Sequence, residues 1–513
     1  MKIFNSRKTK IRLASLFAAL TIVTIGFSFP TESESIHQDP TVTSKQIEAL
    51  PRSTSTAQPP ADRIALYQAL LDLTNPWTVM CIAAHPDDED GTSLIVMRRK
   101  YGAHTVSLFS TFGEGGQNAI GPELYEELGA IRARETMAAA EIQGSEPHFL
   151  GLKDFGYSKS ADEAFKFWGH EEALRRMVLE IRKLRPDVII TNHSVTTNDH
   201  GHHQATARLE LEAFDAAADP KRFPEQLSND VTVWQVQRLF VRARGNAQAD
   251  TAPVVTIDPN ERDPIRNTVF AEEALRALQK HATQGPWPKT FAEFAARFRA
   301  FSGQSGATGQ LPPIRYRLVR EAKGVQPLPK DANSFLASLV VPAELAQRLA
   351  PLWSDQSLIP LNERELVLPR LLALAKTFHQ ANRPQTLIAM PRVAAMAKRL
   401  DAALAAAAGM TVDVAPETKA LLPGVPANFN IDVVNHGSVE ARLGEVHFDG
   451  MGMGEGHGSS TRVLPAGQSA MLVRTFTAPS NATVTVPHQD HLYDGREFGE
   501  KFTAIVTDRK SVV

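Results

Sequence analysis

The chain has 513 residues, of which 43% are hydrophobic and 22% are charged, values near globular averages that exclude a largely disordered protein. Its 55 basic and 57 acidic residues leave a formal net charge of -2, so no global field attracts nucleic acid or anionic lipid, and we expect no nucleic-acid partner. At roughly 100 to 200 residues per domain, the length predicts about two to four domains. The sequence does not indicate an oligomeric state.

Residues 1–30 are typical of a secretory signal peptide or N-terminal anchor. Basic residues up to Arg12 precede an apolar run from Leu13 to Phe29, which is the order of charge and hydrophobicity in a signal. The run is slightly long for a cleaved signal and slightly short for a spanning helix. Residues 31–60 are polar and rich in Pro, Ser and Thr, as in a flexible tether. We therefore expect export to the periplasm or the exterior, with cleavage and membrane anchoring both open.

Residues 61–285 alternate apolar β-like runs with helical patterns, which predicts a layered α/β fold with a mainly parallel sheet. Polar clusters follow the first and the last predicted strand, and open α/β sheets bind ligands beyond the carboxyl ends of strands, so we expect one shared crevice. Cys81 is the only cysteine, which excludes an intramolecular disulfide and favours a small buried core residue. The predicted strands cover 77–84, 104–112, 147–150 and 187–192, and the predicted helices cover 93–101, 122–143 and 171–184.

The chain changes character after residue 285. Residues 286–409 are predicted to be a linker followed by a helical region, because Pro and Gly punctuate the first part and apolar residues recur at helical spacing in the second. From residue 410 the pattern alternates, as in strands, which predicts a β-sandwich-like domain over 410–513. The expected core-facing helix stripes are Leu366, Leu371, Leu374 and Phe378, and then Val393, Met396, Leu400 and Leu404.

The first polar cluster offers the parts of a hydrolytic metal site. Such a zinc site uses about three protein ligands and a water, with imidazole and carboxylate as common donors. His85 and Asp88 are three residues apart around Pro86, so they can converge on one ion. Asp87 can then act as general base for the water that the metal activates. The loop therefore predicts two metal ligands and a base for attack on an amide carbonyl.

The second polar cluster, residues 198–203, reads Asn-Asp-His-Gly-His-His and is expected to supply the third ligand. If a helix begins here, His200 and His203 both lie near the ion, so that one binds the metal while the other polarises the carbonyl. His200 is the candidate for stabilising the oxyanion and protonating the leaving amine. His193, at the end of the preceding strand, is a candidate for contact with a metal ligand. A His-x-x-His pattern alone is weak, but the first cluster strengthens it.

Residues 84–89, Ala-His-Pro-Asp-Asp-Glu, resemble the signature loop of the PIG-L/LmbE-like de-N-acetylases. The resemblance continues through segments 113–118, 131–135 and 154–158 and the second cluster, covering about residues 75–285. It implies a Rossmann-like catalytic domain over 61–285 that removes acetyl groups from N-acetylglucosamine conjugates. Zinc is the implied metal, and iron(II) also suits such donors. The residue roles implied are zinc binding by His85, Asp88 and His203, general base for Asp87, and oxyanion stabiliser or acid for His200.

The second cluster departs from the family pattern. The family motif is His-Pro-Asp-His, whereas residues 200–203 read His-Gly-His-His. The aspartate that would orient His200 is therefore missing, and Asp199 is the candidate replacement.

Three further residues are predicted to contact the substrate. Arg132 matches a family position that does so, and its guanidinium suits a phosphate or sugar hydroxyls. An ion pair with Glu135 is the alternative for Arg132. Glu114 and Asp154 are the other candidates, with a plain turn and a packed loop as their respective alternatives. The glycine-rich loop around Glu114 lacks the Gly-Lys-Ser/Thr of a nucleotide-binding P-loop.

The function expected from these patterns is hydrolysis of an N-acetyl group on an amino-sugar or glycoconjugate substrate. Two alternatives stay open. One is an amidase or esterase that acts on a non-sugar substrate, because the metal loop does not encode the acyl group or the amine. The other is an inactive glycan-binding protein that binds through its C-terminal β region.

Overall fold

The computed structural model describes residues 61–195, 199–228, 231–243, 252–302, 310–354, 363–418, 422, 424–443, 445–448, 462–477, 480 and 504–507. The predicted signal segment and tether, residues 1–60, lie outside the described residues. The described residues fall into two compact units that divide after Ala407. Among them, no helix is both long and apolar enough to cross a bilayer.

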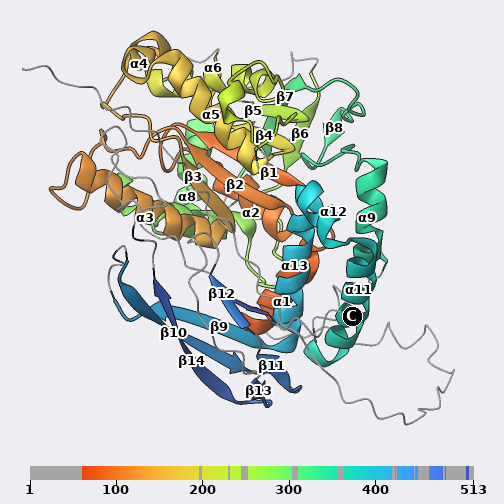
Figure 1. Cartoon of the computed structure of the whole chain (residues 1–513). Helices are drawn as coiled ribbons and strands as arrows, with labels where there is room; N and C mark the ends of the chain where they lie inside the picture. Colours follow the sequence, from red (N-terminus) through yellow and green to blue (C-terminus); the bar gives the residue numbers. More distant parts are fainter. Residues whose placement is uncertain are drawn as a thin grey trace, which may run out of the picture. The chain divides into compact units, whose positions relative to one another are not determined.

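An eight-stranded sheet forms the centre of the first unit, in the order β3-β2-β1-β4-β5-β7-β6-β8 (Figure 1). The first five strands in this order pair in parallel, and β7 runs antiparallel to both β5 and β6. The predicted mixed α/β fold with a mainly parallel sheet is thus confirmed. The strands are β1 (Thr78–Ala83), β2 (His104–Phe109), β3 (Ser145–Phe149), β4 (Val188–Thr191), β5 (Arg238–Arg242), β6 (Val254–Ile257), β7 (Ile314–Glu321) and β8 (Asp331–Ala332).

All four predicted strands are present as β1 to β4, and the sheet then extends beyond them. Strands β7 and β8 belong to it, although they lie past residue 285 in the stretch assigned to a linker and helical region. The sequence of β7, IRYRLVRE, places an arginine at every second or third position, and its burial is partial. Such a strand lacks the continuous apolar run that identifies a buried parallel strand.

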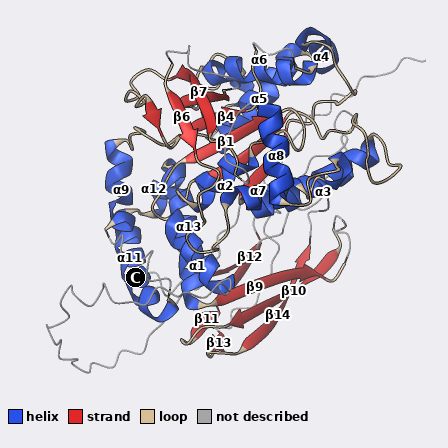
Figure 2. Cartoon of the chain, turned by 180° about the vertical axis from the view of Figure 1, so that it is seen from behind, coloured by secondary structure: helices blue, strands red, loops and turns tan. Residues whose placement is uncertain are grey.

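Helices pack on both faces of the sheet, as Figure 2 shows from behind. Because side chains alternate along a strand, Met80 and Ile82 of β1 pack with α5 and α6, while Val79 and Cys81 pack with α2 and α7. Cys81 is fully buried, as expected. The helices are α1 (Ala61–Asp72), α2 (Gly91–Arg99), α3 (Glu126–Gln143), α4 (Ala161–Trp168), α5 (His170–Leu184), α6 (Gly201–Ala216), α7 (Phe270–Leu278) and α8 (Phe291–Ser302).

The later part of the first unit is helical. The four residues of the second predicted stripe are all buried, namely Val393, Met396, Leu400 and Leu404. In the first stripe, however, Leu366 is 51% exposed. That expectation was wrong because five residues turn a helix by about 500°, which leaves Leu366 roughly 140° away from Leu371. Leu371, Leu374 and Phe378 are buried as expected. The helices are α9 (Ala343–Trp353), α11 (Arg364–Ala381), α12 (Pro384–Ala389) and α13 (Pro391–Ala408).

The described part of the second unit is made of strands. Strand β10 (Pro426–Asn435) pairs antiparallel with β9 (Met410–Pro416) and β14 (Ser469–Thr477). Two further antiparallel pairs are β11 (Ala441–Leu443) with β13 (Arg462–Leu464), and β12 (Glu445–Phe448) with β15 (Ala504–Thr507). Alternate residues of β10 are buried, as on a sheet with one covered face. The β-sandwich itself stays a prediction.

Candidate functional site

The two polar clusters follow neighbouring strands of the central sheet. Strand β1 pairs with β2 on one side and with β4 on the other. The chain therefore winds away from β1 in opposite directions, and such a switch point opens a crevice beyond the carboxyl ends of the strands. The loop after β1 carries His85 to Asp88, and the segment after β4 leads to α6 and His203. This adjacency brings together residues more than 100 positions apart.

A tight turn after β1 shapes the first cluster. The amide of Asp88 donates to the carbonyl of His85 at 3.2 Å, and Asp87 between them has a φ of 88°. Aspartate tolerates positive φ better than most residues. The turn brings His85 Nδ1 to 2.9 Å from Asp88 Oδ2. Asn192, at the end of β4, donates to the Asp88 carbonyl at 2.7 Å and links the two clusters.

Helix α6 positions the second cluster. His200 is its N-cap and Gly201 its first residue. A Cβ atom at Gly201 would lie 2.4 Å from the Ser160 carbonyl oxygen, so this position requires glycine where the family motif has proline. The first turn then brings His203 Nε2 to 3.2 Å from Asp88 Oδ2. The ring of His193 stacks on that of His203, with 4.3 Å between the ring centroids. The sequence had indicated His193 as a candidate for such a contact with a metal ligand.

The three predicted metal ligands form one donor set. His85, Asp88 and His203 each offer a ligand atom, and these atoms lie within 4.8 Å of one another. Tetrahedral zinc with bonds of about 2.0–2.1 Å to nitrogen and oxygen needs ligand atoms about 3.3 Å apart, so the donor set fits. Burial raises the pKa of Asp88, but His203 and His85 outweigh it and hold that pKa well below its usual value. The ionised carboxylate suits a divalent cation.

Asp87 lies beside this donor set but outside it. Its amide donates to Glu89 Oε2 at 3.0 Å, which holds the turn in place. Burial, followed by the charges of Asp88 and Glu89, raises the pKa of the Asp87 carboxyl well above its usual value. Arg132 and a hydrogen bond from Gln284 oppose that rise. A carboxylate with a raised pKa next to a metal site is suited to accepting a proton.

His200 faces the donor set from the N-terminus of α6. Its ring lies edge-on to His85 at 5.3 Å between centroids. Ser158 contacts both ring nitrogens, its amide at 3.3 Å from Nε2 and its hydroxyl at 3.2 Å from Nδ1; the sequence had offered Asp199 for this orienting role. Burial and then the nearby imidazoles of His85 and His203 lower the pKa of His200 to about 4, which makes its neutral form dominant.

Arg132 is buried beneath the glycine-rich loop. It donates to the carbonyls of Gly113 and Gln117 at 2.5 and 2.8 Å. A Cβ atom at Gly116 would lie 2.7 Å from its Nη1, so the glycine allows the close approach. Glu135, the alternative partner considered from the sequence, accepts two hydrogen bonds from Thr283. Arg132 therefore shapes the loop, and its contact with substrate stays a prediction.

Glu114 and Asp154 join two loops behind the donor set. Glu114 accepts hydrogen bonds from the amides of Phe112 at 3.1 Å and Asp154 at 2.8 Å. Burial and the charge of Asp154 raise the pKa of Glu114 to about 7. Asp154 Oδ2 lies 3.8 Å from His85 Nε2. Both carboxyls are close to the site, and their contact with substrate stays a prediction.

Residues 281–284 reach the site without any motif that marks them. Gln284 donates to the Pro86 carbonyl at 2.5 Å, and His281 Nε2 lies 3.4 Å from Glu89 Oε1. His281 precedes a short 3-10 helix, Ala282–Gln284, of which Gln284 is the last residue, and only the folded chain places this helix against the metal loop.

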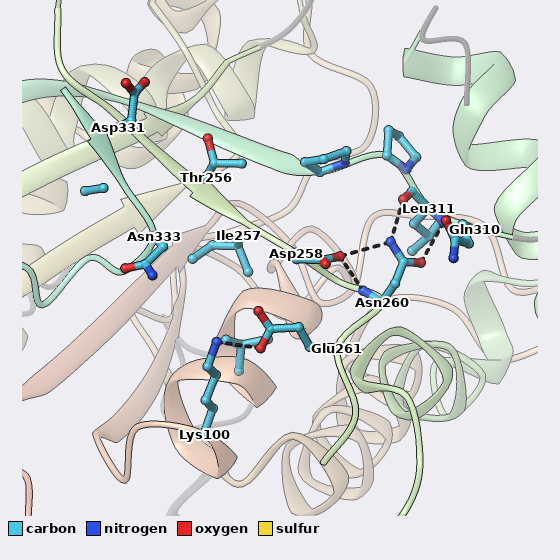
Figure 3. A pocket seen from close by; sticks show the side chains of 14 residues that line it. Lys100, Thr256, Ile257, Asp258, Asn260, Glu261, Gln310, Leu311, Asp331 and Asn333 are labelled. Atoms are coloured by element: carbon cyan, nitrogen blue, oxygen red, sulfur yellow. Dashed lines mark hydrogen bonds and ion pairs between the residues drawn. The ribbon is translucent and has the colours of Figure 1, made fainter. Parts of the chain in front are cut away.

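A separate pocket lies at the end of β6 (Figure 3). It has a volume of about 510 Å³, and Lys100, Asp258, Asn260 and Glu261 are among its lining residues. Lys100 Nζ lies 2.5 Å from Glu261 Oε2, and Asn260 donates to Asp258 at 3.0 Å. None of the predicted site residues lines this pocket, so the clustered histidines, rather than the pocket, define the candidate site.

Comparisons with known proteins cover the part of the chain that carries this site. The PIG-L family model, described as GlcNAc-PI de-N-acetylase, matches residues 80–214, a span that includes both clusters. The chain is 30% identical to the 1D-myo-inositol 2-acetamido-2-deoxy-alpha-D-glucopyranoside deacetylase of Thermobifida fusca over 241 residues, 41% of this chain and 84% of the relative. It is 28% identical to the mycothiol S-conjugate amidase of Streptomyces coelicolor, over 30% of this chain and 57% of the relative.

Among solved structures, the conserved protein TT1542 from Thermus thermophilus covers 52% of this chain and 97% of its own, at 22% identity. Its TM-score of 0.32 is too low to support a shared fold. The family is therefore established by the sequence relatives and by the model match.

Proposed function

The chain belongs to the PIG-L family of de-N-acetylases, and we propose that it is a metal-dependent hydrolase that removes the N-acetyl group from an N-acetylglucosamine-type conjugate. The observation that carries this proposal is the convergence of His85, Asp88 and His203 beside Asp87. The names of the deacetylase relatives describe an acetylated glucosamine conjugate as the substrate, which supports an amino-sugar substrate here.

His85, Asp88 and His203 would hold zinc through Nδ1, Oδ2 and Nε2, respectively. Bound zinc supplies a Lewis acid that lowers the pKa of water and polarises a carbonyl oxygen. The proposal keeps iron(II) as an alternative occupant, because the same donors suit it.

The proton transfers fall to this chain's own residues. Asp87 is proposed to take the proton of the attacking water, a role supported by its raised pKa and its place next to the ligands. Neutral His200 is proposed to exchange one of its ring contacts with Ser158 for a hydrogen bond that it donates to the oxygen of the substrate carbonyl as charge develops there. The released amine then takes up the proton that Asp87 accepted from the water.

Substrate contacts are proposed for Arg132, Glu114 and Asp154. Arg132 supports the glycine-rich loop from below, and Glu114 joins that loop to Asp154. We propose that their main contribution is to hold the sugar-facing loops in place. Tyr157, which is 78% exposed and lies edge-on to His200 at 4.9 Å, is placed to contact a sugar ring directly.

A second candidate is an amidase or esterase that acts on a non-sugar substrate. The amidase relative supports it, and the donor set serves either substrate. An inactive glycan-binding protein remains the alternative outside catalysis, and the intact set of three ligands and a base argues against it.

The decisive experiment measures amine release from N-acetylated sugars, glycolipids and peptidoglycan fragments, with and without a chelator. We expect release from at least one N-acetylglucosamine conjugate, loss with the chelator, and recovery when zinc is added back. Release from a non-sugar amide alone would favour the amidase. No release from any substrate by zinc-loaded protein would contradict the enzymatic proposal.

We further propose export, guided by the basic and then apolar residues 1–30. Fractionation of the native host followed by mass measurement of the chain distinguishes a cleaved signal from a retained anchor. Recovery of the full-length chain from the cytoplasm would contradict export.

A further inference from the structure

His202 is a buried histidine between the two residues assigned to catalysis and metal binding in the second cluster. Its Nδ1 lies 3.0 Å from Nε2 of His85, although the two residues are 117 positions apart in the chain. We propose that His202 is a positioning residue that accepts a hydrogen bond from Nε2–H of His85 and thereby turns Nδ1 of His85 toward the metal. This inference rests on the metal site of the proposed function.

The two nitrogens of His85 face different partners. Nδ1 lies 2.9 Å from Asp88 Oδ2, on the side of the donor set, and Nε2 faces His202. A ligating imidazole nitrogen carries no proton, so the other nitrogen must carry it and needs an acceptor. Asp154 Oδ2 is 3.8 Å from Nε2, too far for a hydrogen bond. His202 is thus the acceptor within reach among the described residues.

Accepting this hydrogen bond also determines the tautomer of His202. Its Nδ1 must be unprotonated, so a neutral His202 carries its proton on Nε2. That Nε2 is buried and has no hydrogen-bond partner within the described part of the chain. Nδ1 is therefore the nitrogen of His202 that is engaged, and the engagement is with His85.

The surroundings of His202 hold its ring in one orientation. The side chain is fully buried and stacks on Trp168 at 5.0 Å between centroids, with an interplanar angle of 21°. Phe155 meets it edge-on at 4.5 Å. The amide of His202 donates to Ser158 Oγ at 2.8 Å. Because two aromatic side chains pack on the ring and the backbone is anchored, the ring is preorganised to accept the hydrogen bond from His85.

A competing explanation is a second cation between His85, His200 and His202, whose ligand atoms also lie within 4.8 Å of one another. That arrangement needs an unprotonated Nε2 on His85. If the first ion binds Nδ1, His85 would have to lose both ring protons and bridge two ions. The hydrogen bond requires only the ordinary neutral imidazole, which is why we favour it. The two explanations differ in the number of ions bound.

The test compares His202→Phe with His202→Asn. Phenylalanine keeps an aromatic ring between Trp168 and Phe155 but has no acceptor, whereas the amide oxygen of asparagine can take the place of Nδ1. Zinc affinity is measured by chelator competition, and melting temperatures of the zinc-free proteins check the fold. We expect His202→Phe to weaken zinc binding about 10- to 100-fold, as is typical for loss of such a partner. His202→Asn should recover most of the affinity.

Several results would overturn the proposal. One is a folded His202→Phe protein that binds zinc as tightly as the parent. Another is equal weakening in both variants. A third is a parent that binds two ions and a His202→Phe variant that binds one. A parent that binds no zinc would instead contradict the proposed function itself, so the two failures are distinguishable.

A second measurement needs no variant. The ¹⁵N chemical shifts of the His85 ring in the zinc-loaded parent report which nitrogen is protonated. Protonated Nε2 with metal on Nδ1 supports the proposal, and metal on Nε2 overturns it.

Discussion

Glu135 on α3 accepts two hydrogen bonds from Thr283, one from the backbone amide at 2.9 Å and one from the hydroxyl at 2.6 Å. Neither residue belongs to the metal loop. The next residue, Gln284, donates to the Pro86 carbonyl within that loop and hydrogen-bonds to Asp87. Through Gln284, the pair of Glu135 and Thr283 positions the proposed general base.

Thr283→Val should lower kcat/KM while leaving the zinc content unchanged. The exchange removes the hydroxyl that donates to Glu135 and leaves a carboxylate oxygen without its partner, at a cost of about 1–3 kcal/mol. Thr105→Val is the matched control, because Thr105 on β2 is equally buried and donates to the Gly144 carbonyl at 2.9 Å, away from Glu135. Equal losses of activity in the two variants would argue against a specific role for Thr283.

Asp87→Asn should reduce turnover by about 10²- to 10⁴-fold, the contribution typical of a general base. Asparagine has nearly the same shape and tolerates the positive φ of this position. Steady-state kinetics and metal analysis of the same preparation separate a lost base from a lost metal. Unchanged turnover would show that another group takes the proton.

His203→Ala should lower zinc affinity by more than the 10- to 100-fold that is typical of losing an indirect partner, because it removes a direct ligand. His170→Ala is the control. His170 pairs with Glu212 at 3.0 Å, on the helical layer of α5 and α6. Chelator competition on both proteins measures the difference. If His203→Ala holds as much zinc as the parent, the third ligand has been assigned wrongly.

His148 on β3 should make stability fall at alkaline pH. Burial lowers its pKa, but Glu146 and Glu180 outweigh burial and raise the pKa to about 9. A His pKa raised above its ordinary value of about 6.5 stabilises the fold fully below pH 6.5, and the contribution disappears as pH rises through 9. At about 1.36 kcal/mol per pKa unit, the contribution is about 3 kcal/mol. Urea unfolding at pH 6 and pH 9.5 should show this loss in the parent.

His148→Gln removes the titrating group. The free energy of unfolding of this variant should therefore change less across the same pH range. The variant therefore serves as the control for every other group that titrates there. If parent and variant lose the same stability between pH 6 and pH 9.5, the ion pairs of His148 are not responsible.

Much of the catalytic unit was predictable because its signals are local. Buried parallel strands contain long apolar stretches, and β1, β2 and β4 were found in this way. The helix predicted over 122–143 does end at Gln143 as α3, and the next residue, Gly144, adopts the left-handed conformation. Strand β7 was not predicted, because arginines interrupt its apolar residues and Pro-rich and Gly-rich stretches flank it in the sequence.

The site residues also divide into those that local sequence spacing predicted and those that only the fold brings together. The roles expected for His85, Asp87 and Asp88 follow from a spacing of three residues, which one turn can satisfy. The partner of Arg132 was less predictable, because helical spacing suggested Glu135 whereas the folded loop offers the carbonyls of Gly113 and Gln117. A buried guanidinium takes whichever acceptors the loop brings to it.

The sequence by itself determined which residues are candidates for chemistry, namely a loop with two proposed metal donors and a proposed base, and a second cluster rich in imidazole. Tertiary structure alone decided how these parts meet. Pairing of β1 with β4 places His203 at Asp88 and His202 at His85, and Thr283 and Gln284 reach the loop from farther along the chain. The physical reason is range: a turn is specified by neighbouring residues, whereas a contact across more than 100 residues depends on strand order and register.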